Sequence, residues 1–150
     1  MDKDVIISIK GNQSFEDADP ECIELTTLGH LADWGDGGFT LSYQESQLTG
    51  LEGTLTTFQV EQNRIILMRI GKVNSQMVFE VGKPHLSLYN TPYGPLSIGI
   101  STRRMRSTLG VSGGDISIDY AINIDDTAAG ENLFEISVRE AASPITKLKQ

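Results

Sequence analysis

Residues 63–101, NRIILMRIGKVNSQMVFEVGKPHLSLYNTPYGPLSIGIS, decide the fold of this chain. They read as four strands in succession, over residues 64–71, 75–81, 84–90 and 96–103, because short runs of strand-forming residues are separated by turn residues. The connections have the length of hairpin loops, so consecutive strands are expected to pair in antiparallel fashion. The stretch therefore predicts an all-β fold.

A four-residue loop over residues 72–75 is the expected connection of the first two strands. It places Met68 opposite Phe79 and Ile70 opposite Met77, so each directly opposed pair on that face is apolar. Apolar cross-strand pairs of this kind stabilise a sheet, and a slip of one residue would mix the two faces. On this register Met68, Met77 and Phe79 all point into the core.

The second hairpin is set by the connection Thr91-Pro92-Tyr93-Gly94. Proline favours the second position of a type I turn, and glycine accepts the left-handed conformation that follows it. This is the signature of a three-residue hairpin loop with a glycine bulge. The resulting register places Leu86 opposite Ile100 on the apolar face, and His85 and Ser87 on a polar outer face.

Outward from these hairpins the chain continues as strands with short connections. Further strands are expected over residues 4–10, 21–34, 39–44, 53–62, 115–125 and 132–139. Gly29 lies within one of them and indicates a bend or bulge, as barrels need at their corners. A meander of nine or ten twisted strands leaves exposed edges unless it closes on itself. We therefore predict a single antiparallel up-and-down β-barrel of about 8–10 strands, with a β-sandwich as the alternative.

Length and charge limit the organisation and the partners of the chain. Its 150 residues are enough for one domain with a sizeable core, expected over residues 1–142, followed by a flexible tail over residues 143–150. The net charge of −8 argues against a nucleic-acid partner or an anionic membrane surface, because phosphate groups repel an acidic protein.

The N-terminus and the cysteine content indicate the compartment. The first residues lack the apolar stretch of a secretory signal, and no apolar run approaches the roughly 20 residues that span a bilayer. A cytoplasmic protein is therefore expected. The single cysteine, Cys22, excludes an intrachain disulfide and is expected to be a small buried or half-buried apolar residue.

Several short motifs in this frame resemble those of the YwiB-like family of bacterial proteins. They are Met68-Arg69-x-Gly71, Phe79-x-x-Gly82, Tyr89-x-Thr91-x-x-Gly94 and the alternating run GDISIDYAINID at residues 114–125. The resemblance extends from about Val5 to Val138 and implies a small calycin-type, lipocalin-like β-barrel. Its motifs consist of turn glycines and core aromatic residues, so they indicate a fold and no particular chemistry.

A barrel of about eight strands is either filled by side chains or holds one small ligand. The candidate ligand-binding residues are the larger side chains expected to point inward, namely Tyr43, Met68, Met77, Phe79 and Tyr120. Such a set would suit a small apolar or amphipathic ligand that a tyrosine hydroxyl orients. The alternative is a solid-core structural or protein-interaction module without a ligand. No cofactor is expected in either case.

Apolar residues lie on both faces of the strand at residues 64–70. Its outer side is therefore expected to be covered, either by the connection over residues 11–20 or by a second copy of the chain. A homodimer is one of the two partner hypotheses, beside a small apolar ligand.

The sequence gives weaker evidence for a catalytic or metal site than for a bound ligand or a dimer. His85 and Ser87 would share a strand face, but no carboxylate has an obvious place to orient the histidine, so no enzyme is expected. A metal site built from His30, His85 and Cys22 would need three strands to converge without a spacing signature, so no metal is expected.

Two groups of charged residues are expected to be ordinary surface features, and each could instead bind an anion. Arg69 and Glu80 are expected to lie diagonally on one face as a surface salt bridge, although they could also anchor a carboxylate. Arg103, Arg104 and Arg106 could bind a phosphate or an acidic partner, but against a charge of −8 a solvated strand end is favoured.

Overall fold

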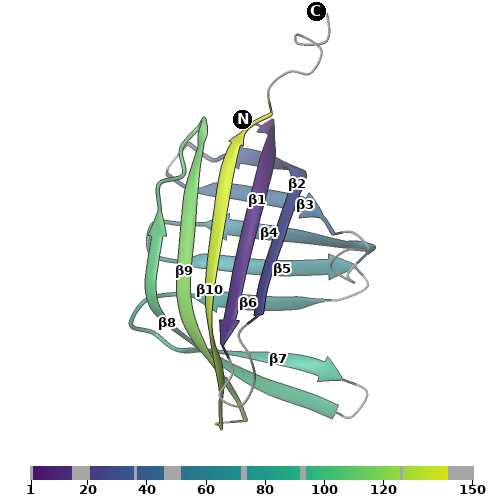
Figure 1. Ribbon diagram of the computed structural model, residues 1–150, viewed down its shortest axis with the longest axis vertical. Helices are drawn as coiled ribbons and strands as arrows, with labels where there is room; N and C mark the ends of the chain where they lie inside the picture. Colours follow the sequence, from purple (N-terminus) through teal and green to yellow (C-terminus); the bar gives the residue numbers. More distant parts are fainter. Residues whose placement is uncertain are drawn as a thin grey trace, which may run out of the picture.

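The computed structural model describes residues 2–14, 21–35, 37–45, 52–71, 74–91, 94–125 and 127–141. Its ten elements are all β-strands, as the sequence predicts (Figure 1). They are β1 (Asp2–Ser14), β2 (Glu21–Asp33), β3 (Phe39–Gln44), β4 (Thr54–Val60), β5 (Ile65–Gly71), β6 (Ser75–Phe79), β7 (His85–Thr91), β8 (Gly94–Ser107), β9 (Gly113–Ile124) and β10 (Thr127–Glu140). The tail predicted from residue 143 lies outside the described residues.

The strands form one antiparallel sheet in the order β6-β5-β4-β3-β2-β1-β10-β9-β8-β7. Strands that follow each other in sequence are neighbours throughout, except for β6 and β7, which are the two ends of the sheet. The chain closes on itself because β1 pairs with β10 from Val5 opposite Glu140 to Ser14 opposite Glu131. The predicted up-and-down barrel is therefore confirmed.

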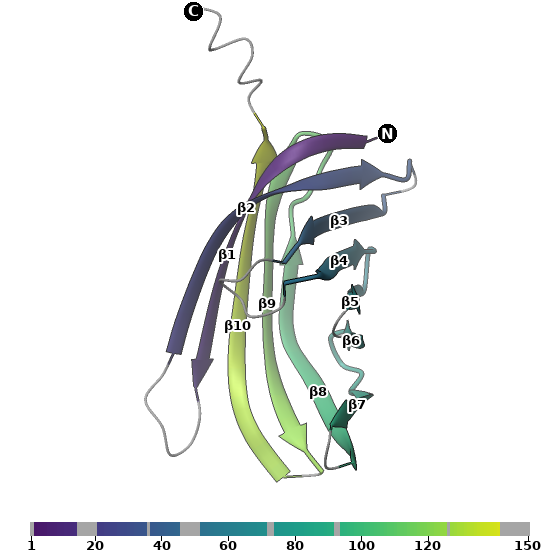
Figure 2. The same ribbon diagram turned by 90° about the vertical axis from the view of Figure 1, so that its right-hand side faces the viewer.

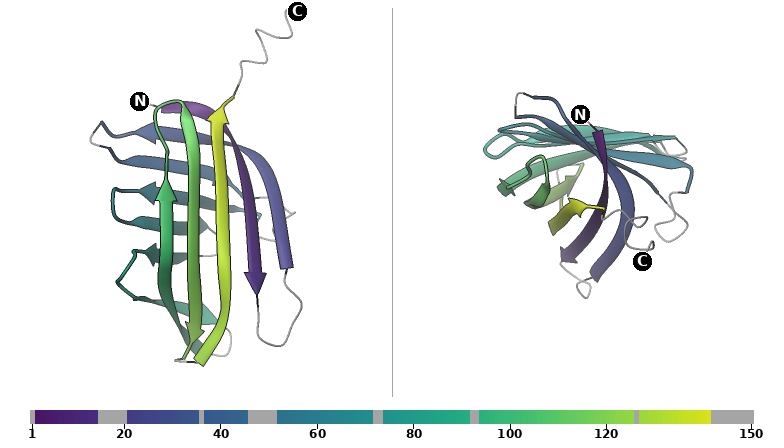
Figure 3. Two further views of the ribbon diagram at one scale, coloured as in Figure 1. Left: turned by 60° about the vertical axis from the view of Figure 1, so that its left-hand side comes forward. Right: turned by 90° about the horizontal axis from the view of Figure 1, so that it is seen from above.

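Figure 1 shows β8, β9, β10, β1 and β2 along the long axis of the molecule, with β3 to β6 running across behind them. Figure 2 shows β1 and β2 curving over the top toward β3, and the view from above in Figure 3 shows the interior between the two layers. At Gly29 on β2, a β-carbon would lie 2.4 Å from Ile7 Cδ1 and 2.4 Å from the main-chain oxygen of Ser42. Only glycine leaves room for this close approach, and the pairing of β1 with β2 continues through Gly29 without a register shift.

A seam between β6 and β7 leaves the barrel nearly closed instead of fully hydrogen-bonded. Val81, which follows β6, forms a single parallel bridge with Thr102 of β8 near the seam. The hydroxyl of Ser87 donates a hydrogen bond to the main-chain oxygen of Gln76. Side chains therefore supply much of the closure that a continuous ladder supplies elsewhere in the sheet.

The predicted register of the β5–β6 hairpin is wrong. Met68 lies opposite Gln76 and Leu67 opposite Met77, so the faces of β5 are exchanged relative to the prediction. The side-chain amide of Asn74 forms two hydrogen bonds of 3.2 Å with the main chain of Gly71, so these two residues are joined at the hairpin end. Because β5 is apolar on both faces, the rule of matching apolar pairs could not distinguish the two registers.

The predicted register of the β7–β8 hairpin is also wrong, by one residue. Thr91 pairs with Gly94, so the connection has two residues instead of three. Leu86 consequently lies opposite Gly99 and its side chain is 77% exposed, while His85 lies opposite Ile100. A change of one residue in loop length moves every side chain of a strand to the other face.

The core lies between the two layers and is mostly aliphatic. Its largest fully buried side chains include Phe58, Phe79, Ile7, Leu31, Leu41, Ile65, Ile100, Ile116, Ile118 and Ile136. The rings of Phe58 and Phe134 meet edge to face with their centroids 6.1 Å apart. Cys22 was predicted to be buried or half-buried and is exposed, because the first half of β2 pairs with β1 alone.

Candidate functional site

The predicted ligand-binding residues do not form one site. Met77, Phe79 and Tyr120 are buried, and the rings of Phe79 and Tyr120 are in contact with their centroids 4.7 Å apart. Tyr43 is buried as well, but at the other end of the short strands. Met68 is on the outer face of β5, because the hairpin register differs from the predicted one.

Tyr43 belongs to a buried polar cluster that the sequence did not reveal. The cluster, called the Glu45 cluster below, consists of Tyr43, Glu45, Thr54, Thr56 and Arg69. It lies where β3 and β5 end and β4 begins. The main-chain N–H of Glu45 donates to the oxygen of Thr54 at 2.8 Å, which extends the β3–β4 ladder by one residue and turns the Glu45 side chain inward.

The carboxylate of Glu45 is the most deeply buried charge for which an ion pair is described, with 1% of its side chain exposed. The hydroxyl of Thr56 donates a hydrogen bond to Glu45 Oε2. The Nε atom of Arg69 lies 3.9 Å from the same oxygen, an ion-pair distance that is too long for a hydrogen bond. Thr56, Arg69 and the hydroxyl of Tyr43, which is hydrogen-bonded to Glu45, therefore all contact this side chain from neighbouring positions of the sheet.

Burial and charge keep the Tyr43 hydroxyl protonated. Burial first, and then the negative charge of Glu45, raise the pKa of Tyr43 above its ordinary value of 10.0. The positive charge of Arg69 lowers it by less. The phenol of Tyr43 is therefore neutral at neutral pH.

Among the residues that the structure describes, two polar atoms of the Glu45 cluster have no hydrogen-bond partner. They are Thr54 Oγ1, on a side chain that is fully buried, and Arg69 Nε. Buried polar atoms are nearly always satisfied, so each exception requires an explanation such as a water molecule or a ligand. The arrangement can accept a small group that donates one hydrogen bond and accepts another.

Tyr120 is part of a second polar row. It lies opposite Thr102 on β8 and opposite Asn132 on β10. Thr102 Oγ1 and Asn132 Oδ1 have no hydrogen-bond partner within the described part of the chain. This row contains no charged side chain, whereas the Glu45 cluster buries a carboxylate beside a guanidinium. The Glu45 cluster is therefore the stronger candidate, since buried charges concentrate at functional sites.

Comparison with known proteins places this barrel in a family. A family model described as "Domain of unknown function (DUF1934)" matches residues 7–136. The chain belongs to the DUF1934 family. The match runs from β1 into β10 and includes every residue of the Glu45 cluster.

A sequence comparison and a structure comparison, both with the YwiB protein of Bacillus subtilis, support the fold of this DUF1934 domain. It is 27% identical over 111 residues to the "Uncharacterized beta-barrel protein YwiB" of Bacillus subtilis (strain 168), with 74% of this chain and 76% of that protein covered. The crystal structure of the ywiB protein from Bacillus subtilis superposes with a TM-score of 0.81 at 23% identity, covering 94% of each chain. The resemblance to YwiB-like barrels inferred from the sequence is therefore confirmed.

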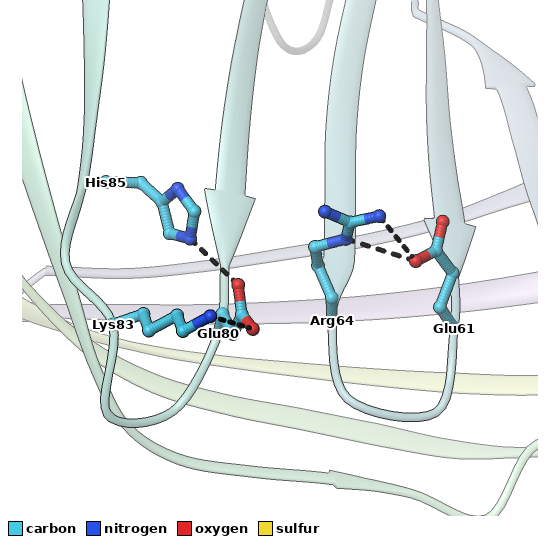
Figure 4. A network of polar contacts seen from close by, with 5 residues as sticks. All are labelled: Glu61, Arg64, Glu80, Lys83 and His85. Carbon is cyan, nitrogen blue, oxygen red and sulfur yellow. Dashed lines mark hydrogen bonds and ion pairs between the residues drawn. The ribbon is translucent and has the colours of Figure 1, made fainter.

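The carboxylate that sequence reasoning could not place beside His85 is Glu80. Its Oε1 lies 3.1 Å from His85 Nε2, and its Oε2 lies 3.9 Å from Lys83 Nζ (Figure 4). The predicted diagonal pair of Arg69 with Glu80 is therefore wrong. The hydroxyl of Ser87 is directed to the main chain of Gln76, so the described contacts do not join it to His85.

The other polar candidates of the DUF1934 domain lie apart from one another. His30 Nδ1 lies 3.0 Å from Asp4 Oδ1 on an exposed surface, and Cys22 is exposed. Over the described ranges, no three His, Cys, Asp or Glu side chains are grouped so that they could hold a metal ion. The same ranges contain no helix that is long and apolar enough to cross a membrane.

Proposed function

We propose that this DUF1934 barrel binds one small amphipathic molecule, and that the Glu45 cluster holds its polar head group. The observation that carries the proposal is the pair of unpartnered atoms, Thr54 Oγ1 and Arg69 Nε, beside the buried carboxylate of Glu45. The proposal concerns binding and includes no catalytic step.

Stability alone does not explain the Glu45 cluster. Taking a carboxylate and a guanidinium out of water costs several kcal/mol per ion, and apolar residues of similar volume are often at least as stabilising. A cluster that also leaves Thr54 Oγ1 unpartnered is a poorer structural solution than an apolar one. Its presence at one end of an apolar core supports a role in binding.

The charges of the cluster favour a neutral head group. Glu45 and Arg69 offset each other, so a charged ligand would leave one unbalanced charge in a buried site. A hydroxyl or an amide can accept a hydrogen bond from Arg69 Nε and donate one to the oxygen of Thr54. Arg69 is 21% exposed, whereas Glu45 is almost fully buried, so the head group would approach along the side of Arg69.

Apolar side chains adjoin the cluster and would receive the body of the ligand. Leu41, Phe58 and Leu67 each lie two residues from a cluster member on the same strand face, and Met77 lies opposite Leu67. The flexible side chain of methionine adapts its shape to an irregular neighbour. The ligand body would stay at this end, because the rings of Phe79 and Tyr120 fill the interior at the other.

Displacement of a fluorescent probe tests the head-group preference. The probe is N-phenyl-1-naphthylamine, and the competitors are 1-octanol, octanoate and octyltrimethylammonium, which share their chain length. We expect 1-octanol to displace the probe at a concentration about tenfold lower than either ion, because a buried unbalanced charge is penalised by at least 1.4 kcal/mol. Equal displacement by all three, or no saturable probe binding, would contradict the proposal.

A second candidate function is an interaction module that pairs with another copy of the chain. It is favoured by an apolar strip on the outer face, where Ile70 is 59% exposed and lies opposite Leu55, which is 36% exposed. Met68 is on the same face of β5. Sedimentation velocity of the purified protein, compared with the Ile70→Glu variant, tests it: a dimer that the substitution dissociates supports the pairing, and a monomer in both cases contradicts it.

A further inference from the structure

A shift of register in β8 gathers three arginines on one face of the barrel. Thr102 pairs with Tyr120, but the next paired residue is Arg104, opposite Asp119. The extra residue, Arg103, reaches Glu131 on the outer face, with Arg103 Nη2 2.8 Å from Glu131 Oε2. Strict alternation would have separated Arg103 from Arg104, so this β-bulge is what brings it to the same side.

A groove lies beneath these arginines. It has a volume of about 510 Å³ and is lined by Val81, Arg103, Arg104, Met105, Arg106, Ser117, Asp119 and Leu133. This volume is within the range of sites for small molecules. Three arginines therefore line a recess together with three apolar residues and with Ser117 and Asp119.

The charges in the groove favour an anion. Glu131 holds Arg103, and the hydrogen bond and charge of Arg103 lower the pKa of Glu131, so that this carboxylate remains ionised at neutral pH. Arg104 Nη2 lies 3.5 Å from Asp119 Oδ2, but the side chain of Arg104 is 86% exposed and the contact is loose. Arg106 is exposed, and the described contacts give it no ion pair. Positive charge therefore exceeds negative charge within the groove.

We infer that this groove binds a small molecule that carries an oxyanion, phosphate or carboxylate, on an apolar body. Guanidinium groups match the geometry of such anions and form charge-assisted hydrogen bonds with them. Met105, Val81 and Leu133 provide the apolar contact. The net charge of −8 repels a large polyanion at long range, whereas a small anion within about 8 Å of the arginines experiences mainly their field.

Nuclear magnetic resonance of the arginine Nε–Hε groups tests this site. The probes are phenyl phosphate, benzoate and benzyl alcohol, which differ in charge at a constant ring. We expect saturable shifts at Arg104 and Arg106 with both anions, tighter binding of phenyl phosphate because of its second charge, and no saturation with benzyl alcohol. Saturation by benzyl alcohol equal to that by the anions, or no saturation by either anion, would overturn the inference.

Two substitutions with opposite effects make the test specific to the groove. Arg106→Gln should weaken phenyl phosphate binding about tenfold, and Asp119→Asn should strengthen it several-fold by removing the opposing charge. Arg64→Gln is the matched control, because Arg64 is a similarly exposed arginine that pairs with Glu61 in a different turn. Unchanged affinity in Arg106→Gln and Asp119→Asn, or an equal loss in Arg64→Gln, would refute binding in this groove. Thermal unfolding of each variant verifies that it is folded.

Discussion

His85 Nε2 lies 3.1 Å from Glu80 Oε1 across the seam between β6 and β7. Both side chains are partly buried, at 29% and 21% exposure, so their contact is less screened by solvent than the surface pairs of this protein. The contact bridges the one interval of the sheet where β6 and β7 lack a ladder. The pair therefore links the end of β6 to the start of β7, where the described residues have no ladder.

We expect Glu80→Gln to lower the free energy of unfolding by about 1 kcal/mol, since the pair is half-screened and the seam has few other bonds. Urea denaturation measures the loss. Glu61→Gln is the control, because the Glu61–Arg64 contact is more exposed and lies within a turn. A loss in Glu61→Gln as large as that in Glu80→Gln would contradict a special role of the seam pair.

Leu67→Ala and Met68→Ala test the register of β5. Leu67 is buried, so its truncation should cost about 3 kcal/mol, while truncation of the outward Met68 should cost less than about 1 kcal/mol. Chemical denaturation of the two variants gives the comparison. The register predicted from the sequence requires the reverse order, and that order would contradict the structure.

Gly29→Ala tests the close approach of the main chain of Ser42 to β2. The added carbon would meet the main-chain oxygen of Ser42 at 2.4 Å, and main chain cannot give way as a side chain can, so we expect destabilisation by about 2–3 kcal/mol. Gly99→Ala is the matched control within a strand, because its nearest atoms would lie at an ordinary 3.6 Å. The difference in melting temperature between the two variants measures the effect, and equal melting temperatures would argue against this close approach.

The dependence of stability on alkaline pH tests the environment of Tyr43. The pKa of Tyr43 is raised in the folded protein, so the tyrosine is protonated in both the folded and the unfolded chain well below pH 10. In that range it does not make the free energy of unfolding depend on pH. Above pH 10 the unfolded chain releases this proton while the folded protein retains it, and stability falls with pH. We expect Tyr43→Phe to have a shallower fall between pH 10 and 11 than the unsubstituted protein in urea denaturation. Identical slopes would contradict a buried, protonated Tyr43.

The sequence predicted the strands and their closure because those depend on local patterns. Alternation alone identified Ile116, Ile118 and Tyr120 as inward-facing, and all three are buried. Gly29 indicated a special position in β2, which the structure shows to be a close approach of the main chain of Ser42. The arrangement of ten strands into a barrel follows from short connections and the need to cover sheet edges.

The site was less predictable because it depends on register and on single residues at strand ends. Arg69 joins the Glu45 cluster only because Leu67, on the same face of β5, points into the core. The sequence could not predict this face, because β5 is apolar on both sides. Glu45 directly follows the predicted strand at residues 39–44 and was not among the predicted site residues. The available signal was that Glu45 lies two residues after Tyr43 and four after Leu41, so a continued strand would point all three side chains inward.

Substitution of two threonines on β4 tests ligand binding at the Glu45 cluster most directly. Thr54→Val removes an unpartnered buried hydroxyl, and Thr57→Val removes a hydroxyl that faces outward on the same strand. By calorimetric titration with 1-octanol, we expect Thr54→Val to bind about tenfold more weakly than the unsubstituted protein while its stability is retained, and Thr57→Val to bind normally. Equal affinity in all three proteins would contradict a head-group site at this cluster.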